Sequence, residues 1–178
     1  TPCGGVGGGA RKPGHTLVTG VKGGCGVNND GEPIVQYDKA ANRWVLTQFS
    51  VTNPATYGYL QCVAVSTTSD ATGSYYRYAF SYGGKQFNDY PKLGVWPDGY
   101  YISANVFNPS GSSYLGPQAF AFDRAKMLTG APAAFVSPTG PAGASIDPFL
   151  PASLDGMTLP PAGAPNTFVG FPGQSFNP

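Results

Sequence analysis

Acidic residues are the first candidates for chemistry in this 178-residue chain, although there are only nine of them and Glu32 is the single glutamate. A hydrolase acting on glycosidic bonds needs two carboxyl groups roughly 5 to 10 Å apart. Asp89 lies beside Tyr90, and Asp98 and Asp38 lie at equivalent ends of two expected strands; Asp89, Asp98 and Tyr90 are the catalytic candidates. The alternative is that the aspartates cap turns, which Asp does well beside Gly and Pro.

Oxygen-bearing side chains also crowd the stretch that leads into the first expected strand. Asn28, Asp30, Glu32 and Asp38 lie within eleven residues of one another (28 to 38). Calcium takes six to eight oxygen ligands, so this stretch predicts a Ca²⁺ site, and Ca²⁺ is the one cofactor expected. The spacing is not that of an EF-hand, and a turn capped by Asn and Asp remains the alternative.

Histidine and cysteine narrow the chemistry further. His15 is the only histidine and has no apparent partner, which argues against a Ser-His-Asp triad or a multi-histidine metal site. The three cysteines, Cys3, Cys25 and Cys62, allow one disulfide. We prefer Cys25 with Cys62, and a pair that includes Cys3 stays open. Such a pair favours a secreted protein, whereas three buried thiols would be compatible with a cytosolic one.

Aromatic side chains supply a second kind of candidate site. Five of them cluster around one expected hairpin and are the predicted ligand-binding residues: Tyr76, Tyr78, Trp96, Tyr100 and Tyr101. A strand points alternate residues to opposite faces, so some of these rings would be exposed. Exposed Tyr and Trp on a rigid sheet form a platform for a polysaccharide or a cell-surface protein. The alternative is that most of the rings pack between neighbouring sheets.

Composition excludes several classes of protein. Charged residues make up 11% of the chain and the net charge is +1, so no basic surface for nucleic acid is expected. No run of 18 apolar residues exists, which predicts the absence of a transmembrane segment. The 26 Gly and 18 Pro, beside 11 Tyr and 11 Phe, indicate an ordered protein of strands and turns.

Alternating apolar residues predict an all-β fold made of repeated four-stranded antiparallel units. The turn Pro97-Asp98-Gly99 joins two of the strands as a hairpin. A single short helical segment is expected at 124–130. The expected strands are 33–38, 43–51, 59–66 and 75–82, then 91–98, 100–107, 119–123 and 133–137.

The units start at Pro33, Pro91 and Pro151, which are 58 (91 − 33) and 60 (151 − 91) residues apart. This spacing is at the long end for a propeller blade. It divides the chain into a Gly-rich arm (1–26), a first β-meander unit (27–88), a second unit (89–148) and a partial third unit with a Pro/Gly-rich tail (149–178).

Several motifs carry a resemblance to a known group of proteins. They include Asn28-Asn-Asp-Gly-Glu-Pro33, Tyr37-Asp38 with Arg43-Trp44, and Asp89-Tyr-Pro-Lys-Leu-Gly-Val-Trp-Pro-Asp98. Over roughly residues 24–171 the chain resembles large, poorly characterised secreted bacterial proteins with predicted β-propeller repeats. The resemblance implies a propeller-like fold and an extracellular location, and it supplies no catalytic residues.

A propeller closes with four to eight blades, whereas this sequence contains two full units and part of a third. We therefore expect an incomplete propeller: a piece of a longer chain, or one that is completed by homo-oligomerisation through exposed sheet edges. The expected function is an extracellular binding or structural role at the cell surface or in an extracellular assembly. The alternative is a secreted carbohydrate-active hydrolase, of the glycosidase or sialidase kind, that uses an Asp pair, so whether the chain is an enzyme stays open.

Overall fold

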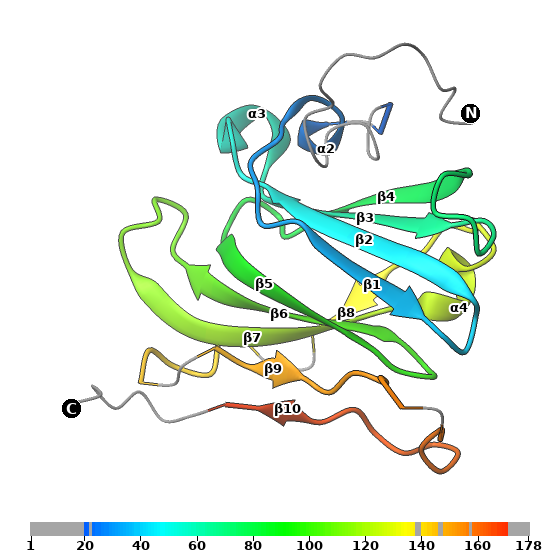
Figure 1. The fold of residues 1–178 in the computed structure, drawn as a ribbon. Helices are drawn as coiled ribbons and strands as arrows, with labels where there is room; N and C mark the ends of the chain where they lie inside the picture. Colours follow the sequence, from blue (N-terminus) through cyan, green and yellow to red (C-terminus); the bar gives the residue numbers. More distant parts are fainter. Residues whose placement is uncertain (1–19, 22, 138–139, 146–147, 157, 171–178) are drawn as a thin grey trace, which may run out of the picture.

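The computed structural model describes residues 20–21, 23–137, 140–145, 148–156 and 158–170. They form two four-stranded antiparallel sheets and a two-stranded hairpin, which lie one below another in Figure 1. The first sheet contains β1 (Ile34–Asp38), β2 (Arg43–Ser50), β3 (Leu60–Ser66) and β4 (Tyr75–Ser81). The second sheet contains β5 (Phe87–Val95), β6 (Tyr100–Phe107), β7 (Tyr114–Phe122) and β8 (Phe135–Val136). The hairpin consists of β9 (Leu150–Pro151) and β10 (Phe168–Val169).

The predicted all-β class and the four-stranded antiparallel units are confirmed, because each sheet is a meander in chain order. The turn at Pro97 is also confirmed: Trp96 and Gly99 exchange two backbone hydrogen bonds, with N to O distances of 3.0 and 3.4 Å. Proline presets the backbone for this tight turn, so the reversal follows from local sequence.

A single apolar core joins the two large sheets. It is formed by residues from both: Val45, Val63, Val65 and Phe80 from the first sheet, and Leu93, Val95, Tyr100, Ile102, Ala104, Phe120 and Phe122 from the second, with Met127. The rings of Phe80 and Phe122 meet edge to face with centroids 4.8 Å apart. Burial of these side chains is the main force that holds the sheets face to face.

Polar side chains then link all three units at their first strands. The Gln36 amide Nε2 donates to the Leu93 carbonyl at 2.5 Å. The Ser153 hydroxyl accepts from the Val95 backbone N–H at 3.2 Å and donates to Gln36 Oε1 at 3.1 Å. Beside them, β9 lies so close to β5 that a Cβ atom on Gly94 would be 2.4 Å from the Ala152 carbonyl oxygen. Strands β1, β5 and β9 are therefore consecutive neighbours.

In the described part of the chain, three short helices accompany the strands: α2 (Gly24–Val27), α3 (Pro54–Tyr57) and α4 (Arg124–Met127). The expected helical segment at 124 corresponds to α4, whose first turn is capped by the Asp123 carboxylate accepting from the Lys126 N–H at 3.1 Å. The expectation of only one helix was wrong. In α3, Pro54 stands at the first helical turn, a position that suits proline, and this signal was overlooked. Among the described residues, no helix is long and apolar enough to cross a membrane.

Two strands begin earlier than the sequence indicated. Strand β5 starts at Phe87, so the unit boundary expected between 88 and 89 falls inside it, and its register shifts between Asp89 and Lys92. Pro91 lies in this bulge and does not start the strand. Strand β7 starts at Tyr114 and tolerates Pro117, because β8 pairs only with Ala121 and Phe122. The short apolar stretch at 16–19 predicts one further short strand, and these residues lie outside the described part of the chain.

The first two units repeat one another in backbone detail. Glu32 (φ 53°) and Tyr90 (φ 49°) both adopt the left-handed conformation, and each directly precedes a proline: Pro33 lies just before β1, and Pro91 lies in the bulge of β5. Non-glycine residues seldom adopt this conformation. Its recurrence 58 residues later (90 − 32) therefore supports a structural repeat.

Candidate functional site

Three connections meet at one end of the molecule, which we call the loop end: the β1–β2 turn (39–42), the β5–β6 turn (96–99) and the β9–β10 connection (152–167). The Trp96 indole N–H donates to the Ala164 carbonyl at 2.8 Å, and Lys39 Nζ donates to the Asp155 carbonyl. Of the residues predicted from sequence, the loop end brings together Asp38, Trp96, Asp98, Tyr100 and Tyr101.

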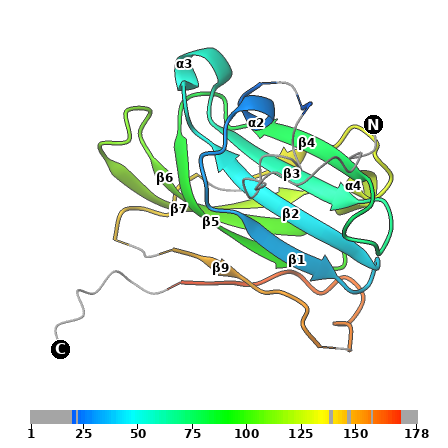
Figure 2. The same cartoon turned by 45° about the horizontal axis from the view of Figure 1, so that its top comes forward.

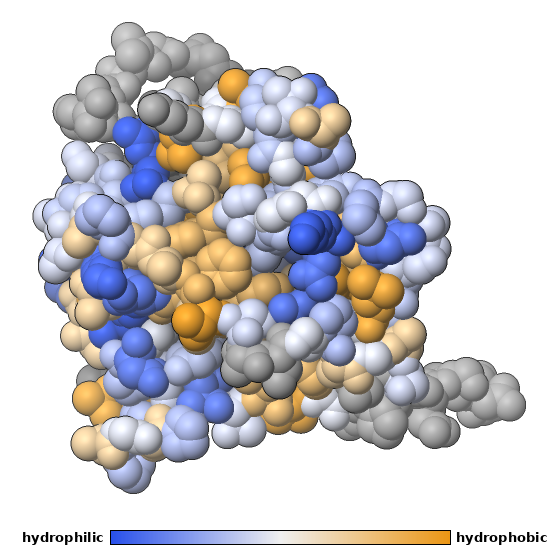
Figure 3. All heavy atoms as spheres, turned by 180° about the vertical axis from the view of Figure 1, so that it is seen from behind, coloured by the Kyte–Doolittle hydropathy of each residue, from blue (hydrophilic) through white to orange (hydrophobic). Residues whose placement is uncertain are grey.

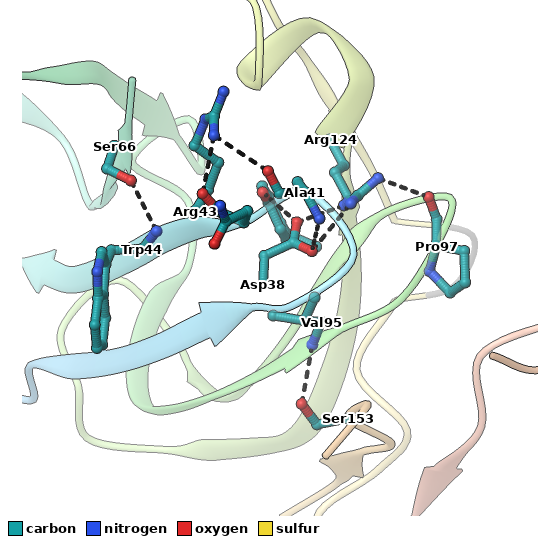
Figure 4. Close-up of polar contacts among 11 residues, drawn as sticks. Asp38, Ala41, Arg43, Trp44, Ser66, Val95, Pro97, Arg124 and Ser153 are labelled. Carbon is teal, nitrogen blue, oxygen red and sulfur yellow. Dashed lines mark hydrogen bonds and ion pairs between the residues drawn. The ribbon is translucent and has the colours of Figure 1, made fainter. Parts of the chain in front are cut away.

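The centre of the loop end is a fully buried carboxylate, that of Asp38 (Figure 4). Its Oδ2 accepts from Arg124 Nε at 2.7 Å and from the Tyr100 hydroxyl at 2.9 Å. Its Oδ1 accepts from Arg124 Nη2 and from the Ala41 N–H, both at 3.0 Å. With two protein donors on each oxygen, Asp38 has little capacity left to ligate a metal or to act as a base. It is an anchor for the surrounding side chains.

The ionisation of the partners is consistent with this anchoring role. Burial by itself lowers the pKa of Arg124, but the hydrogen bond and charge of Asp38 raise it, and the net pKa is raised, so Arg124 stays charged. Burial, and then the negative charge of Asp38, raise the pKa of Tyr100 well above its ordinary value. Tyr100 therefore remains a neutral donor to the Asp38 carboxylate.

Two cavities flank Trp96 at the loop end. One, of about 200 Å³, lies between Trp96 and the Asp38 turn and is closed by Leu154 and Leu159. The other, of about 290 Å³, lies between Trp96, Asp98 and the Pro-rich segment 159–164. The Asp98 carboxylate accepts from the Tyr101 hydroxyl at 3.1 Å. Burial and Asp98 together raise the pKa of Tyr101 to about 12. The site is thus an aromatic, mainly apolar recess with one carboxylate beside it.

The catalytic candidates do not come together. Asp89 lies in β5 opposite Asn105, whereas Asp98 follows the other end of that strand. Six residues of extended chain from 89 to 95 span about 20 Å, which is too far for a glycosidase pair. Tyr90 lies in the bulge, where the Lys92 ammonium group is 3.0 Å from the centroid of its ring. The predicted Asp89–Asp98 pair is therefore wrong.

The four calcium candidates also do not form one site. Asn28 and Asp30 bind the carboxyl end of β2: Asp30 Oδ2 accepts from the Val51 N–H at 2.6 Å and from the Thr52 N–H at 2.8 Å. Asp38 lies at the opposite end of β2, where it pairs with Arg43. Within the described residues, no group of three His, Cys, Asp or Glu side chains could hold a metal ion. Asp30 instead caps backbone N–H groups, which is the alternative to a calcium site that the sequence also allowed.

Two of the aromatic candidates lie away from the loop-end cavities. Tyr78 stacks on Phe80 with ring centroids 5.7 Å apart and donates to the Ala131 carbonyl at 3.2 Å. The ring of Tyr76 lies directly against Gly130. At the loop end itself Tyr100 is only 1% exposed, and Tyr101 packs edge to face on Phe168. The five rings do not form a single exposed platform, and Trp96 alone of the five lines the cavities.

A different aromatic pair is exposed on the first sheet and was not among the predicted site residues. Tyr37 and Trp44 face each other across β1 and β2 with ring centroids 4.8 Å apart. Both are half-exposed. Tyr37 and Trp44 alternate with neighbouring residues as the side chains of buried strands do. The sequence therefore could not show that their face of the sheet is partly exposed, which depends on the strand register and on the stacking of the sheets.

The preferred disulfide is present. Cys25 in α2 is bonded to Cys62 in β3, and both residues are completely buried. The bond fastens the segment before β1 to the outer side of the first sheet.

Comparison of the chain with protein-family models, with curated proteins and with solved structures found no match.

Proposed function

We propose that the protein is an extracellular binding scaffold with propeller-like architecture, and that it binds a polysaccharide at the loop end beside Trp96. It would belong with the secreted propeller-repeat proteins that its motifs resemble. The proposal has three parts, namely the scaffold, the location and the site.

The scaffold is supported by the way in which the units follow one another. The two four-stranded meanders stack face to face, and their first strands, β1 and β5, are followed by β9 of the two-stranded hairpin, which lies next to β5. Propeller blades have this arrangement, with four antiparallel strands per blade and the first strands next to the common axis.

The extracellular location is supported by the buried Cys25–Cys62 disulfide. Structural disulfides persist in oxidising compartments and are rare in reducing ones.

Binding is favoured over catalysis by one observation: the Asp38 carboxylate, the buried acid of the loop end, is fully engaged with Arg124, Tyr100 and Ala41. A general acid or nucleophile needs an oxygen that can reach a substrate. An indole ring between two apolar cavities, with a carboxylate nearby, instead fits the stacking of a sugar ring with a polar anchor.

Tryptophan fluorescence tests the site directly. In Trp44→Phe, Trp96 is the only remaining tryptophan, so its emission reports on the cavities. We expect titration with soluble xylan, pectin, β-glucan or chitosan to shift that emission for at least one polymer. Leu159→Arg, which alters the wall shared by both cavities, should abolish the shift, whereas Leu115→Arg, an exposed leucine on β7, should not. Absence of any shift, together with no retention on the immobilised polymers, would refute the proposed site.

A further inference from the structure

One face of the first sheet carries apolar side chains, as a buried interface would, but these side chains remain partly exposed to solvent. It carries Val35, Tyr37, Trp44 and Leu46, and we call it the first-sheet outer face. Ile34 and Val45 point into the core between the sheets, so their neighbours in β1 and β2 point the opposite way. Val35 is 55% exposed, and the other three residues are partly buried, although none of them is fully covered.

The internal repeat shows which residues correspond to this face in the second sheet. The cross-strand pairs before the turn are Tyr37 with Trp44 in the first sheet and Val95 with Tyr100 in the second.

The next pairs on the same faces are Val35 with Leu46, and Leu93 with Ile102. All four second-sheet residues are at most 6% exposed because the first sheet covers them. The same positions are therefore apolar in both units, and only in the second unit are they buried.

The other end of the stack presents a matching free surface. In the β9–β10 hairpin, Phe168 contacts Tyr101 of the second sheet, and its cross-strand partner Pro151 lies against Gly94. The alternate pair, Leu150 and Val169, points away from the stack and is 49% and 55% exposed. The stack of units therefore has an exposed apolar surface at each end: the first-sheet outer face at one end, and the Leu150–Val169 pair of the β9–β10 hairpin at the other.

We propose that the first-sheet outer face binds the free face of the β9–β10 hairpin of a second copy of this chain. Within one chain, each unit packs against the unit that follows it. The proposed contact is the equivalent packing between the last unit of one chain and the first unit of the other. Two copies, each with two four-stranded units and one two-stranded unit, then close head to tail into a ring of six units, a number within the four to eight blades of closed propellers. This inference rests on the propeller-like scaffold proposed above.

The position of α2 on the first sheet leaves room for the β9–β10 hairpin of a second copy. In the view of Figure 2, α2 lies at the end of the sheet beside α3, while β1 and the adjoining part of β2 run across the front. Contacts of α2 are made with β3 and β2, through Cys25–Cys62 and the segment near Ser50. Among the residues that the structure describes, α2 therefore lies over β2 and β3, and Val35 of β1 remains exposed.

The correspondence between repeated units does not extend to the other exposed apolar surfaces of the molecule. Apolar surface also gathers near the middle of the back of the molecule (Figure 3). Val136 in β8 is 64% exposed, but no repeat relation indicates a partner for it. It instead supplies a matched control.

Light scattering coupled to gel filtration tests the proposal on the full chain. We expect a particle of twice the 18.4 kDa chain mass at micromolar concentration. Val35→Lys and Val169→Glu, one on each proposed face, should each give monomers, while Val136→Lys should remain dimeric. Circular dichroism of each variant checks that it is folded. A wild-type monomer, a filament, or a dimer that survives Val169→Glu would overturn the proposal.

Mixing the two variants distinguishes a head-to-tail contact from a symmetric one. A mixed dimer of Val35→Lys with Val169→Glu contains one interface in which neither residue is changed, so the mixture should recover at least half of the dimer that both variants lose. No recovery would contradict the head-to-tail arrangement. Polysaccharide binding by the monomeric Val35→Lys chain is measured separately: loss of dimerisation with binding kept rejects only this inference, whereas a dimer that binds no polymer rejects only the proposed ligand.

Discussion

Asp38 and Arg124, 86 residues apart in the chain, form a two-pronged ion pair between the turn of the first unit and the helix after the third strand of the second. Arg124 Nη1 also donates to the Pro97 carbonyl at 3.0 Å, so one guanidinium group contacts both turns at the loop end. Because Asp38 is fully buried and the Arg124 side chain is only 12% exposed, loss of either partner leaves a charge without compensation.

We therefore expect Arg124→Met to lower the free energy of unfolding by about 3 to 5 kcal/mol in urea denaturation. The double variant with Asp38→Asn should lose less than the sum of the two single variants, because the remaining charge is then removed as well. Lys126→Ala, which breaks the exposed pair with Asp123, is the control and should change stability by less than about 1 kcal/mol. An Arg124→Met effect as small as that of the control would show that the pair does not hold the units together.

Gly94 determines how closely β9 can approach β5. A Cβ atom there would be 2.4 Å from the Ala152 carbonyl oxygen and 2.9 Å from Pro151 Cβ. Gly94→Ala should therefore displace the hairpin and cost about 1 to 3 kcal/mol, with faster proteolysis between residues 148 and 170. In contrast, Gly140→Ala meets no atom within 4 Å and serves as the control. Equal proteolysis of the two variants would rule out the tight contact.

Asp30 should make the fold sensitive to acid. Burial alone would raise its pKa, but hydrogen bonds from Thr52 and Val51 outweigh burial, and the pKa is lowered. A carboxyl group whose pKa is lower in the folded state stabilises the fold above its unfolded pKa, about 3.9, and this stabilisation is lost as the pH falls through the folded value. Between pH 7 and pH 2, Asp30→Asn should thus lose less stability than the wild type, as measured by thermal melting. An unchanged pH dependence would contradict this role.

The disulfide should stabilise the attachment of α2. Cys25 and Cys62 close a loop with a sequence separation of 37. In a Cys3→Ser background, which removes exchange with the third thiol, Cys25→Ser with Cys62→Ser should lower the free energy of unfolding by about 2 to 4 kcal/mol. Reduction of the Cys3→Ser protein should have the same effect, and reductant should not affect the triple variant. If reduction leaves the melting temperature unchanged, α2 is held by its packing alone.

Much of the secondary structure followed from local sequence. The Pro97-Asp98 turn, the alternation of apolar residues in β2, β4 and β6, and the Asp123 cap of α4 are features of neighbouring residues, and their physical causes are local as well. The early starts of β5 and β7 were missed: the first of these strands was expected to begin at Pro91 and the second at residue 119, after Pro117. A proline is tolerated in a bulge or beside an open edge, and those positions are defined only by the neighbouring strand.

By itself, then, the sequence determined that this protein consists of antiparallel meanders joined by turns, and it left the pairing of the cysteines open. The tertiary structure decided which residues can act together. Tyr37 and Trp44 in the first unit alternate as Val95 and Tyr100 do in the second, yet one pair is half-exposed and the other is buried. The physical reason is that alternation assigns a residue to a face of its sheet, while the order in which sheets stack decides whether that face is covered. The stacking of the sheets also brings Asp38 to Arg124, whereas the extended length of β5 keeps Asp89 apart from Asp98.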